Sequence, residues 1–452
     1  KFLLYNSSMN IIQEFDTITA IATPIGTGGV GVIRISGDKS FEIIDKIYSK
    51  HNLEAGKISH GWIIDGDKKI DEVILLPFRN PHSYTGEDVI EIHCHGGINV
   101  VRNILDVVLK NGARMAERGE FTKRAFLNKK MDLAQAEAVA DLIHAKTRDF
   151  AKQSAKNLSG VLGAKIKEIR TDIFNVLSKI IAGIDFPEDV AEPEYDYIID
   201  EFEKALDKIN KILASANSSN VMRQGIKIAI VGRPNVGKSS LFNTLLNVER
   251  AIVTDIAGTT RDVLTETLDW DVAITLVDTA GIRDNDEVGK VEEIGIEYSK
   301  QSADEADLVL FLYDASKGLN DDDKAILDLI KDKNHIVIAN KADLVQERKP
   351  DAFYLSTVTK EGLDELKDKI KQASYNFSLE DTEFVTNNRQ QDCLIKCRES
   401  LMQALEASKI HQLQDLISID LKSALLYLDE ITGEVITDDI LNNIFDHFCI
   451  GK

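Results

Sequence analysis

An apolar segment, a glycine-rich loop and an amphipathic segment follow one another between residues 226 and 246. The loop, Gly232 to Ser239, reads GRPNVGKS and fits the pattern G-x-x-x-x-G-K-[ST]. The apolar residues before it predict a buried parallel strand, and residues 240–246 predict a helix. Loop N–H groups and a helix N-terminus both favour bound negative charge. The segment therefore predicts an α/β phosphate-binding fold in which Lys238 reaches the β- and γ-phosphates and Ser239 ligates Mg²⁺.

A second phosphate element, D-x-x-G, follows the apolar residues 274–277. We expect Asp278 to hold Mg²⁺ through its water shell and the Gly281 N–H to bond the γ-phosphate. An isolated match of this kind is usually an ordinary turn. Its position one strand after the glycine-rich loop favours the phosphate role. The candidate nucleotide contacts of the two elements are Asn235, Val236, Gly237, Lys238, Ser239, Ser240, Asp278, Thr279, Ala280 and Gly281.

A guanine-selecting element, NKAD, follows the apolar residues 335–339. The Asp343 carboxylate can accept hydrogen bonds from the ring N–H and 2-amino groups of guanine. Adenine lacks both donors, so Asp343 predicts selection of GTP over ATP. We expect Asn340 to steady the loops and the stem of Lys341 to cover the ribose. Ser356 follows a short predicted strand and fits the last guanine-contact loop, with a plain turn serine as the alternative.

The residue after D-x-x-G is Ile282, where Ras-like switches place a glutamine that orients the attacking water. Isoleucine cannot orient water, which leaves two hypotheses. In one, the chain is a slow switch or a binding module that needs an outside activator. In the other, it assembles its own hydrolytic site. Asn235 can ligate a monovalent cation, with the carbonyls of Thr254 and Ile256 and the oxygen of Thr259.

Two further residues complete the second hypothesis. Thr260, in the segment between the first two elements, is expected to close over Mg²⁺ when the γ-phosphate is present. Glu292 lies in the acidic stretch after Ile282 and is a candidate to orient the water. The alternative for Glu292 is a solvated charge on a helix.

Composition sets limits on compartment and partners. The 452 residues suffice for about three domains. With 54 Lys and Arg against 75 Asp and Glu, the formal net charge is −21. This charge argues against a broad nucleic-acid-coating surface but permits a local basic patch. Four cysteines favour a reduced, cytoplasmic setting, and no apolar run reaches the length of a membrane span. Met9 is the expected start, with residues 1–8 an artefact.

The flanking segments differ in periodicity from the GTPase block. Alternating apolar residues at 17–22, 31–36 and 88–93 predict strands, and residues 41–48 and 100–110 predict helices. Apolar residues from Leu158 to Ile184 recur in steps of three and four, which predicts one long helix ending before Pro187. Further helices are expected at 197–216, 393–411, 415–431 and 438–448. The sequence thus predicts an α/β GTPase domain inserted into a helical domain that follows an α+β domain.

Several motifs together resemble one family. They are GVIRISG at 31–37, YTGED at 84–88, GEFTKRAFLN at 119–128, DLAQAEA at 132–138 and the terminal FCIGK. With the GTPase block, they resemble the MnmE (TrmE) family of tRNA-modification GTPases from near Met9 to the last residue. The resemblance implies an N-terminal dimerisation and tetrahydrofolate-binding domain at 9–126. It also implies a helical domain at 127–222 and 376–452, and a GTPase domain at 223–375.

The resemblance also implies an activity and partners. With an FAD-dependent partner of the MnmG type, in a heterotetramer, such a homodimer installs an aminomethyl-type (carboxymethylaminomethyl) group at C5 of the tRNA wobble uridine. A 5-formyl or 5,10-methylene tetrahydrofolate supplies the one-carbon unit, GTP is hydrolysed with K⁺ stimulation, and FAD stays on the partner.

By motif, the family's K⁺ ligands correspond to Asn235, Thr254, Ile256 and Thr259, and its Mg²⁺ ligands to Ser239 and Thr260. Its water-orienting glutamate corresponds to Glu292. Folate contacts correspond to Arg34, Glu87, Lys130 and Lys452, and Cys449 is a possible functional thiol of the C-x-G-K motif.

Other cysteine and histidine residues favour packing. On a strand, His93 and His95 share a face while Cys94 points away, so a metal site is disfavoured. Cys393 and Cys397 stand four apart on a predicted helix and favour a core position. A different class of function, a GTP-dependent ribosome-assembly or RNA-binding switch, remains as the alternative. It would require a basic RNA-binding appendage, which the net charge disfavours.

Overall fold

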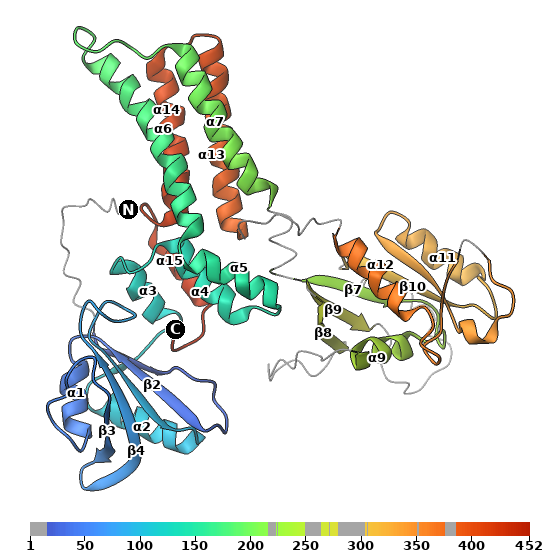
Figure 1. Ribbon diagram of the computed structural model, residues 1–452, viewed down its shortest axis with the longest axis horizontal. Helices are drawn as coiled ribbons and strands as arrows, with labels where there is room; N and C mark the ends of the chain where they lie inside the picture. The colour runs from blue at the N-terminus through green and yellow to red at the C-terminus, as the bar shows by residue number, and fades with distance from the viewer. Residues whose placement is uncertain are drawn as a thin grey trace. The chain divides into compact units, whose positions relative to one another are not determined.

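The computed structural model describes residues 16–215, 223, 225–248, 264–270, 272–278, 303–304, 306–349, 352–375 and 386–452 (Figure 1). The chain divides into two compact units. One unit comprises residues 1–141, 155–210 and 392–452, and the other comprises residues 142–154 and 211–391. Among the described residues, no helix combines the length and the apolar character needed to cross a membrane.

The N-terminal part of the first unit is a six-stranded sheet in the order β3-β4-β5-β2-β1-β6. Its strands are antiparallel except for the parallel pair β1 and β6. The strands are β1 (Ile18–Ile21), β2 (Val30–Ser36), β3 (Ser59–Asp65), β4 (Lys68–Phe78), β5 (Val89–His95) and β6 (Arg114–Met115). Strands β1, β2 and β5 and the two helices predicted in this part are present.

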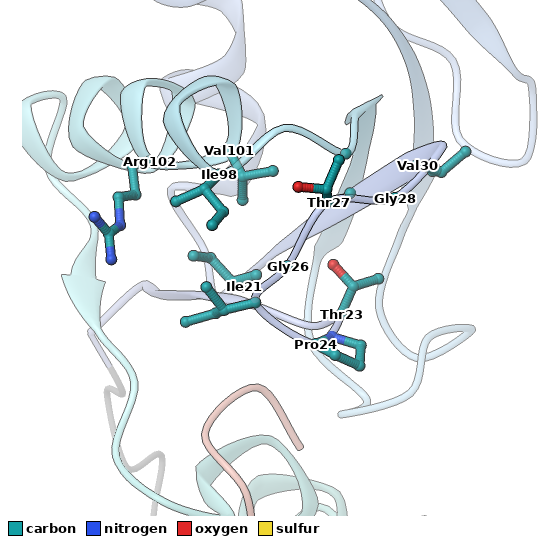
Figure 2. Close-up of a pocket in the computed structure, with 13 residues that line it drawn as sticks. Ile21, Thr23, Pro24, Gly26, Thr27, Gly28, Val30, Ile98, Val101 and Arg102 are labelled. Carbon is teal, nitrogen blue, oxygen red and sulfur yellow. The ribbon is translucent and has the colours of Figure 1, made fainter. Parts of the chain in front are cut away.

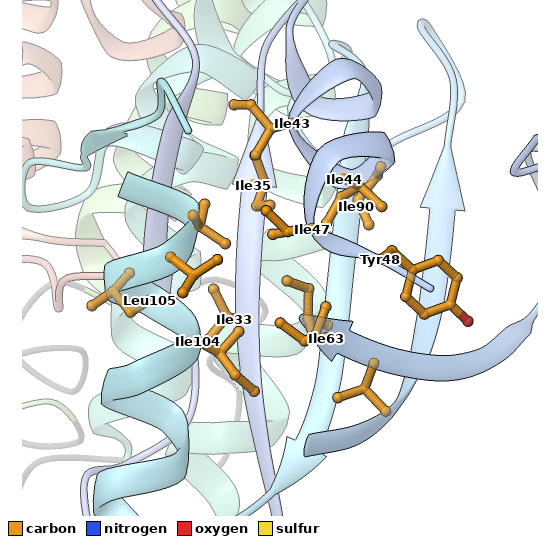
Figure 3. Close-up of a cluster of buried hydrophobic side chains, with 14 of the residues drawn as sticks. Ile33, Ile35, Ile43, Ile44, Ile47, Tyr48, Ile63, Ile90, Ile104 and Leu105 are labelled. Atoms are coloured by element: carbon orange, nitrogen blue, oxygen red, sulfur yellow. The ribbon is translucent and has the colours of Figure 1, made fainter. Parts of the chain in front are cut away.

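Helices α1 (Ser40–Ile47) and α2 (Ile98–Lys110) pack on this sheet (Figure 3). Every second residue of β2, including Ile33 and Ile35, is fully buried, as expected for a strand with one covered face. These side chains meet Ile43 and Ile47 of α1 and Ile104 of α2 in one apolar cluster. The cluster fixes the position of β2, and with it Arg34 on the opposite face of the strand.

The helical part of the first unit is built from helices far apart in the sequence. Helix α6 (Val161–Asp185) packs against α14 (Gln414–Thr432) through apolar residues spaced by three and four. The Arg170 guanidinium forms a bidentate ion pair with the Asp429 carboxylate between the two helices. The other helices that lie wholly or mostly in this unit are α3 (Glu120–Leu127), α4 (Leu133–His144), α7 (Tyr195–Ala214), α13 (Asn388–Lys409) and α15 (Asp438–Asp446). Helix α5 (Arg148–Leu158) has residues 148–154 in the second unit and residues 155–158 in the first.

The long helix predicted to end before Pro187 is present as α6, but its predicted start at Leu158 is wrong. Leu158 ends α5, and the chain turns at Gly160, whose φ of +91° lies in the left-handed region. A residue with a Cβ is strained there, so glycine permits the break while the apolar spacing continues on both sides. Periodicity alone did not register this interruption.

The second unit contains a six-stranded sheet in the order β12-β11-β10-β7-β9-β8. All neighbours are parallel except the hairpin β8–β9. One apolar cluster includes residues of α9 and α12, and a second includes residues of α11. The strands are β7 (Ile226–Val231), β8 (Leu264–Trp270), β9 (Val272–Asp278), β10 (Leu308–Asp314), β11 (His335–Asn340) and β12 (Phe353–Leu355). The helices are α9 (Lys238–Val248), α11 (Asp321–Ile330) and α12 (Leu363–Tyr375), with the 3₁₀ turn η1 (Ala342–Leu344).

Candidate nucleotide and one-carbon sites

The glycine-rich loop joins β7 to α9, as the sequence predicts. Gly237 has a φ of +103°, and a Cβ at this position would lie 2.2 Å from Asn340 Nδ2. Only glycine therefore permits this close approach. The Lys238 ammonium donates to the carbonyls of Gly232 (2.8 Å) and Arg233 (2.9 Å), so its side chain curls over the loop. This geometry places the ammonium where it can bind a phosphate held by the loop.

Asn340 connects the guanine element to the phosphate loop. It ends β11, is 1% exposed, and donates from Nδ2 to the carbonyl of Val236 across 2.8 Å. A buried amide that bonds backbone fixes the distance between the two loops. Asn340 therefore has the steadying position expected from the sequence.

Lys341 and Asp343 of the same element are held by partners from neighbouring loops. The Lys341 ammonium lies 2.8 Å from Asp314 Oδ2 at the end of β10. Burial raises the pKa of Asp314, but hydrogen bonds from Lys341 and Ser316 outweigh it and leave that pKa below its usual value. The buried Ser356 hydroxyl donates to Asp343 Oδ1 across 2.6 Å. The Asp343 carboxylate is thus held in one orientation by the Ser356 hydroxyl.

Arg233, inside the loop, has a partner that the motif does not predict. Its Nε donates to Oδ1 of the fully buried Asp323 across 2.9 Å. Asp323 also closes a capping box with Asn320 at the start of α11. The hydrogen bond and charge of Asp323 raise the pKa of Arg233 against its desolvation. The ion pair anchors the outer part of the loop to α11.

The predicted metal ligands are described only in part. Ser239 and Asn235 are exposed, and Asn235 has a φ of +62°. The last residue of β9, Asp278, pairs with Ile230 next to the start of the loop. A hydroxyl and a carboxylate are ligands of the kind that Mg²⁺ prefers, and the backbone of Asp278 ends β9 beside the strand that leads into the loop. The remaining expected residues, Thr254, Ile256, Thr259, Thr260, Thr279, Ala280, Gly281, Ile282 and Glu292, lie outside the described residues.

The C-terminus and the N-terminal sheet meet at Arg34. Ile450 forms a β-bridge with Arg118, and the Gly451 carbonyl lies 3.4 Å from Arg34 Nη1. Burial and then the charge of Arg34 lower the pKa of Lys452. Two of the four expected folate contacts, more than 400 positions apart in the sequence, are therefore neighbours.

The other two expected folate contacts lie near the YTGED turn. The Lys130 ammonium donates to the Pro81 carbonyl across 2.9 Å, and its stem lies beside Gly86. Glu87 is 8% exposed, and its carboxylate accepts from Ser36 Oγ (2.6 Å) and from Arg124 Nη1 (3.2 Å). The Glu87 carboxylate is therefore buried and hydrogen-bonded to side chains of the protein itself.

Comparison with known proteins identifies the family. The profile described as "GTP-binding protein TrmE N-terminus" matches residues 17–130, and "MnmE helical domain" matches residues 133–449. The tRNA modification GTPase MnmE of Thermoanaerobacter pseudethanolicus is 45% identical over 97% of this chain and 100% of its own length. That of Clostridioides difficile is 44% identical over 97% and 99%. The chain belongs to the MnmE family of tRNA modification GTPases.

A solved structure of Era from Aquifex aeolicus bound to GDP and AlF₄⁻ is 29% identical. Its TM-score is 0.27, and the match covers 39% of this chain and 67% of that one. The assignment to the MnmE family rests on the sequence matches.

Arg124 is the charged residue that motif reasoning missed in this MnmE family member. It is 1% exposed and bridges Glu87 to Glu120, whose Oε1 lies 2.8 Å from Arg124 Nη2. Arg124 stands inside the GEFTKRAFLN motif, so the signal was present in the sequence. Only the fold shows that it links the YTGED turn to α3.

The predicted core positions of Cys393 and Cys397 are confirmed. Cys94, Cys393 and Cys397 are buried, and burial raises the pKa of Cys94 to about 11. His95 lies 2.7 Å from Asp71. Among the described residues, no group of three or more His, Cys, Asp or Glu could hold a metal ion. Cys449 is exposed.

A pocket of about 290 Å³ lies beside the loop between β1 and β2 (Figure 2). Residues 23–28 of the loop form one wall, and Ile98, Val101 and Arg102 of α2 form another. None of the four expected folate contacts is among its lining residues.

Proposed function

We propose that the chain hydrolyses GTP to GDP and phosphate and acts in the modification of tRNA. One observation carries the GTP assignment. Asn340 ties the guanine element to the phosphate loop, and Ser356 orients the Asp343 carboxylate in the same network. The tRNA assignment rests on the MnmE relatives that match the chain over nearly its full length.

Base selection is tested by exchanging the Asp343 carboxylate for an amide. GTP should bind at least about a hundredfold more tightly than ATP, because adenine leaves the carboxylate unpaired. The Asp343→Asn variant should lose its preference for GTP. It should gain affinity for a nucleotide whose base carries a carbonyl in place of the 2-amino group of guanine. Unchanged GTP affinity in this variant would contradict the assignment of the base site.

The hydrolytic step is proposed to proceed without a glutamine or arginine finger. Mg²⁺ held by Ser239 and Thr260, and K⁺ held by Asn235 with Thr254, Ile256 and Thr259, would neutralise charge on the phosphate oxygens. Lys238, whose ammonium bonds the loop carbonyls, would bind the β- and γ-phosphates, and Glu292 would orient the water. The exposed position and positive φ of Asn235 support its part in this proposal.

A tetrahydrofolate site is proposed in the N-terminal domain. Arg34 and Lys452 place two cationic groups close together, and both suit the carboxylates of a folate. Lys130 lies beside the YTGED turn that carries Glu87. The bound folate would supply the one-carbon unit. Cys449, a possible functional thiol, lies two residues before Gly451, whose carbonyl is next to Arg34.

The remaining assignments are proposals drawn from the family. We propose a cytoplasmic homodimer that joins an FAD-dependent MnmG-type protein in a heterotetramer and modifies C5 of the wobble uridine. We also propose domain limits of 9–126, 127–222, 223–375 and 376–452. Co-purification of the full chain with an FAD protein and unmodified tRNA tests the assembly. Recovery of ribosomal subunits without an FAD protein would favour the assembly-factor alternative.

A further inference from the structure

A short region of this acidic chain has the opposite charge. Residues 146–167 contain six Lys and Arg and a single acidic residue, Asp149, although acidic residues outnumber basic ones 75 to 54 in the whole chain. Helix α5 occupies the centre of this region. A local reversal of charge in a protein with a net charge of −21 marks a surface suited to a polyanion.

The cations of α5 lie along one face of the helix. Arg148, Lys152 and Lys156 follow one another at intervals of four residues, which places them about 6 Å apart along the helix axis. All three are exposed, whereas Phe150 and Ser154 on the opposite side are buried. We call these three residues the α5 cationic stripe.

Acidic side chains of the described residues do not neutralise the positive charges of the α5 cationic stripe. Within the part of the chain that the structure describes, no ion pair or side-chain hydrogen bond involves any of its three residues. Nearby cations differ: Lys165 pairs with Glu168, and Arg170 with Asp429. Asp149 lies in the first turn of α5, where the helix dipole favours a negative charge. Like charges four residues apart destabilise a helix, so the stripe costs stability unless an anion binds.

We propose that the α5 cationic stripe binds the sugar–phosphate backbone of the tRNA substrate. Regularly spaced, unpaired Lys and Arg side chains match a chain of phosphates and gain affinity by releasing its counterions. A membrane surface fits less well, because the one aromatic side chain of α5, Phe150, is buried and unable to insert. The described face also presents no aromatic group for base stacking, so the contact should be independent of sequence.

The inference rests on the proposed action on tRNA, and its test reads RNA binding directly. The full chain and the variant R148A/K152A/K156A are titrated into a fluorescently labelled, unmodified tRNA transcript. A control variant, K50A/K68A/K422A, removes the same charge from exposed lysines that lack side-chain partners among the described residues. Anisotropy is recorded from about 50 to 200 mM salt.

The stripe variant should bind at least about tenfold more weakly than the control at about 0.1 M salt. The slope of log affinity against log salt should fall by about two to three. Alanine favours helix, so circular dichroism and GTP turnover without RNA should match those of the parent. The charge-preserving variant R148K/K152R/K156R should retain tRNA binding.

Equal affinity and salt slope in the stripe and control variants would overturn the inference while leaving the tRNA function intact. A parent chain that fails to bind tRNA at low salt would overturn both. Vesicles containing phosphatidylserine serve as a further probe. If they bind the parent but not the stripe variant, while tRNA binds both equally, the stripe is a membrane contact instead.

Discussion

Ser356 donates its hydroxyl hydrogen to the Asp343 carboxylate across an Oγ–Oδ1 distance of 2.6 Å. The hydroxyl itself accepts from the Thr359 N–H at 3.2 Å, which fixes its rotamer. The loop that carries Ser356 thus holds a side chain of the NKAD element. These two hydrogen bonds hold the Asp343 carboxylate in one orientation.

Loss of that hydroxyl should weaken GTP binding moderately. Ser356→Ala removes one hydrogen bond, so we expect about a fivefold increase in the GTP Kd, corresponding to about 1 kcal/mol. Isothermal titration calorimetry measures the change. Ser423→Ala, which removes an exposed helix hydroxyl, is the matched control. Identical affinities in the two variants would show that Ser356 does not orient Asp343.

Potassium dependence should require Asn235. GTP turnover in KCl should exceed that in NaCl by at least about tenfold, since the cation replaces an arginine finger. Asn235→Ala should abolish this difference and leave the Kd for GDP nearly unchanged. Steady-state phosphate release in the two salts measures both effects. A variant that still responds to K⁺ would exclude Asn235 as a ligand.

Removal of Arg124 should strongly destabilise the N-terminal domain. Arg124→Ala leaves the carboxylates of Glu87 and Glu120 buried without their shared cation, which should cost about 3–5 kcal/mol at neutral pH. Lys46→Ala breaks the exposed pair with Glu42 and should cost far less stability than Arg124→Ala. Urea unfolding followed by Trp62 fluorescence in a Trp270→Phe background reports on this domain.

The stability difference between these variants should depend on pH. Burial raises the pKa of Glu120, but hydrogen bonds from Arg114, the Glu117 N–H and Arg124 outweigh it and hold that pKa below 4.5. A lowered folded-state pKa stabilises the fold above 4.5, and this contribution is lost as the pH falls through the folded value. The cost of Arg124→Ala should therefore shrink in acid. A cost that is constant with pH would mean that packing, not charge, holds Arg124.

Folate affinity should depend on the Lys452 ammonium. Lys452→Gln should weaken binding of 5-formyltetrahydrofolate about tenfold, because a charge-assisted hydrogen bond is lost. Burial and Arg34 lower the pKa of Lys452 below 10.5, so the parent should lose affinity at a lower pH than an ordinary lysine would allow. Calorimetry between neutral and alkaline pH measures the profile, with Lys422→Gln as the exposed control. Equal affinity in both variants would remove Lys452 from the site.

Local patterns predicted much of the fold. The strand before the phosphate loop has the predicted ends, Ile226 and Val231, because a short apolar run bounded by glycine is a strong local signal. Strands β3 and β4 were not predicted. Their residues include Gly61, Lys68, Lys69 and Glu72, which are poor strand formers. Pairing with each other stabilises both strands, and β4 is further held by its pairing with β5. Such tertiary stabilisation leaves little trace in the sequence.

In the candidate sites too, local motifs were predictable from the sequence and long-range partners were not. The phosphate and guanine motifs were visible because their residues lie close together in the sequence. The partners Asp314, Asp323 and Arg124 were not singled out, because each acts through contacts with residues distant in the chain. The contact between Arg34 and the C-terminus depends on the fold. In the sequence, only the family resemblance links these two regions.

The most direct test of the proposed function is mass spectrometry of wobble uridines in tRNA from cells that lack this protein. We predict loss of the aminomethyl-type C5 group, restored by the parent chain and not by Asp343→Asn. Wobble nucleosides that are unchanged in the deletion strain would contradict the proposal that this GTPase acts in tRNA modification.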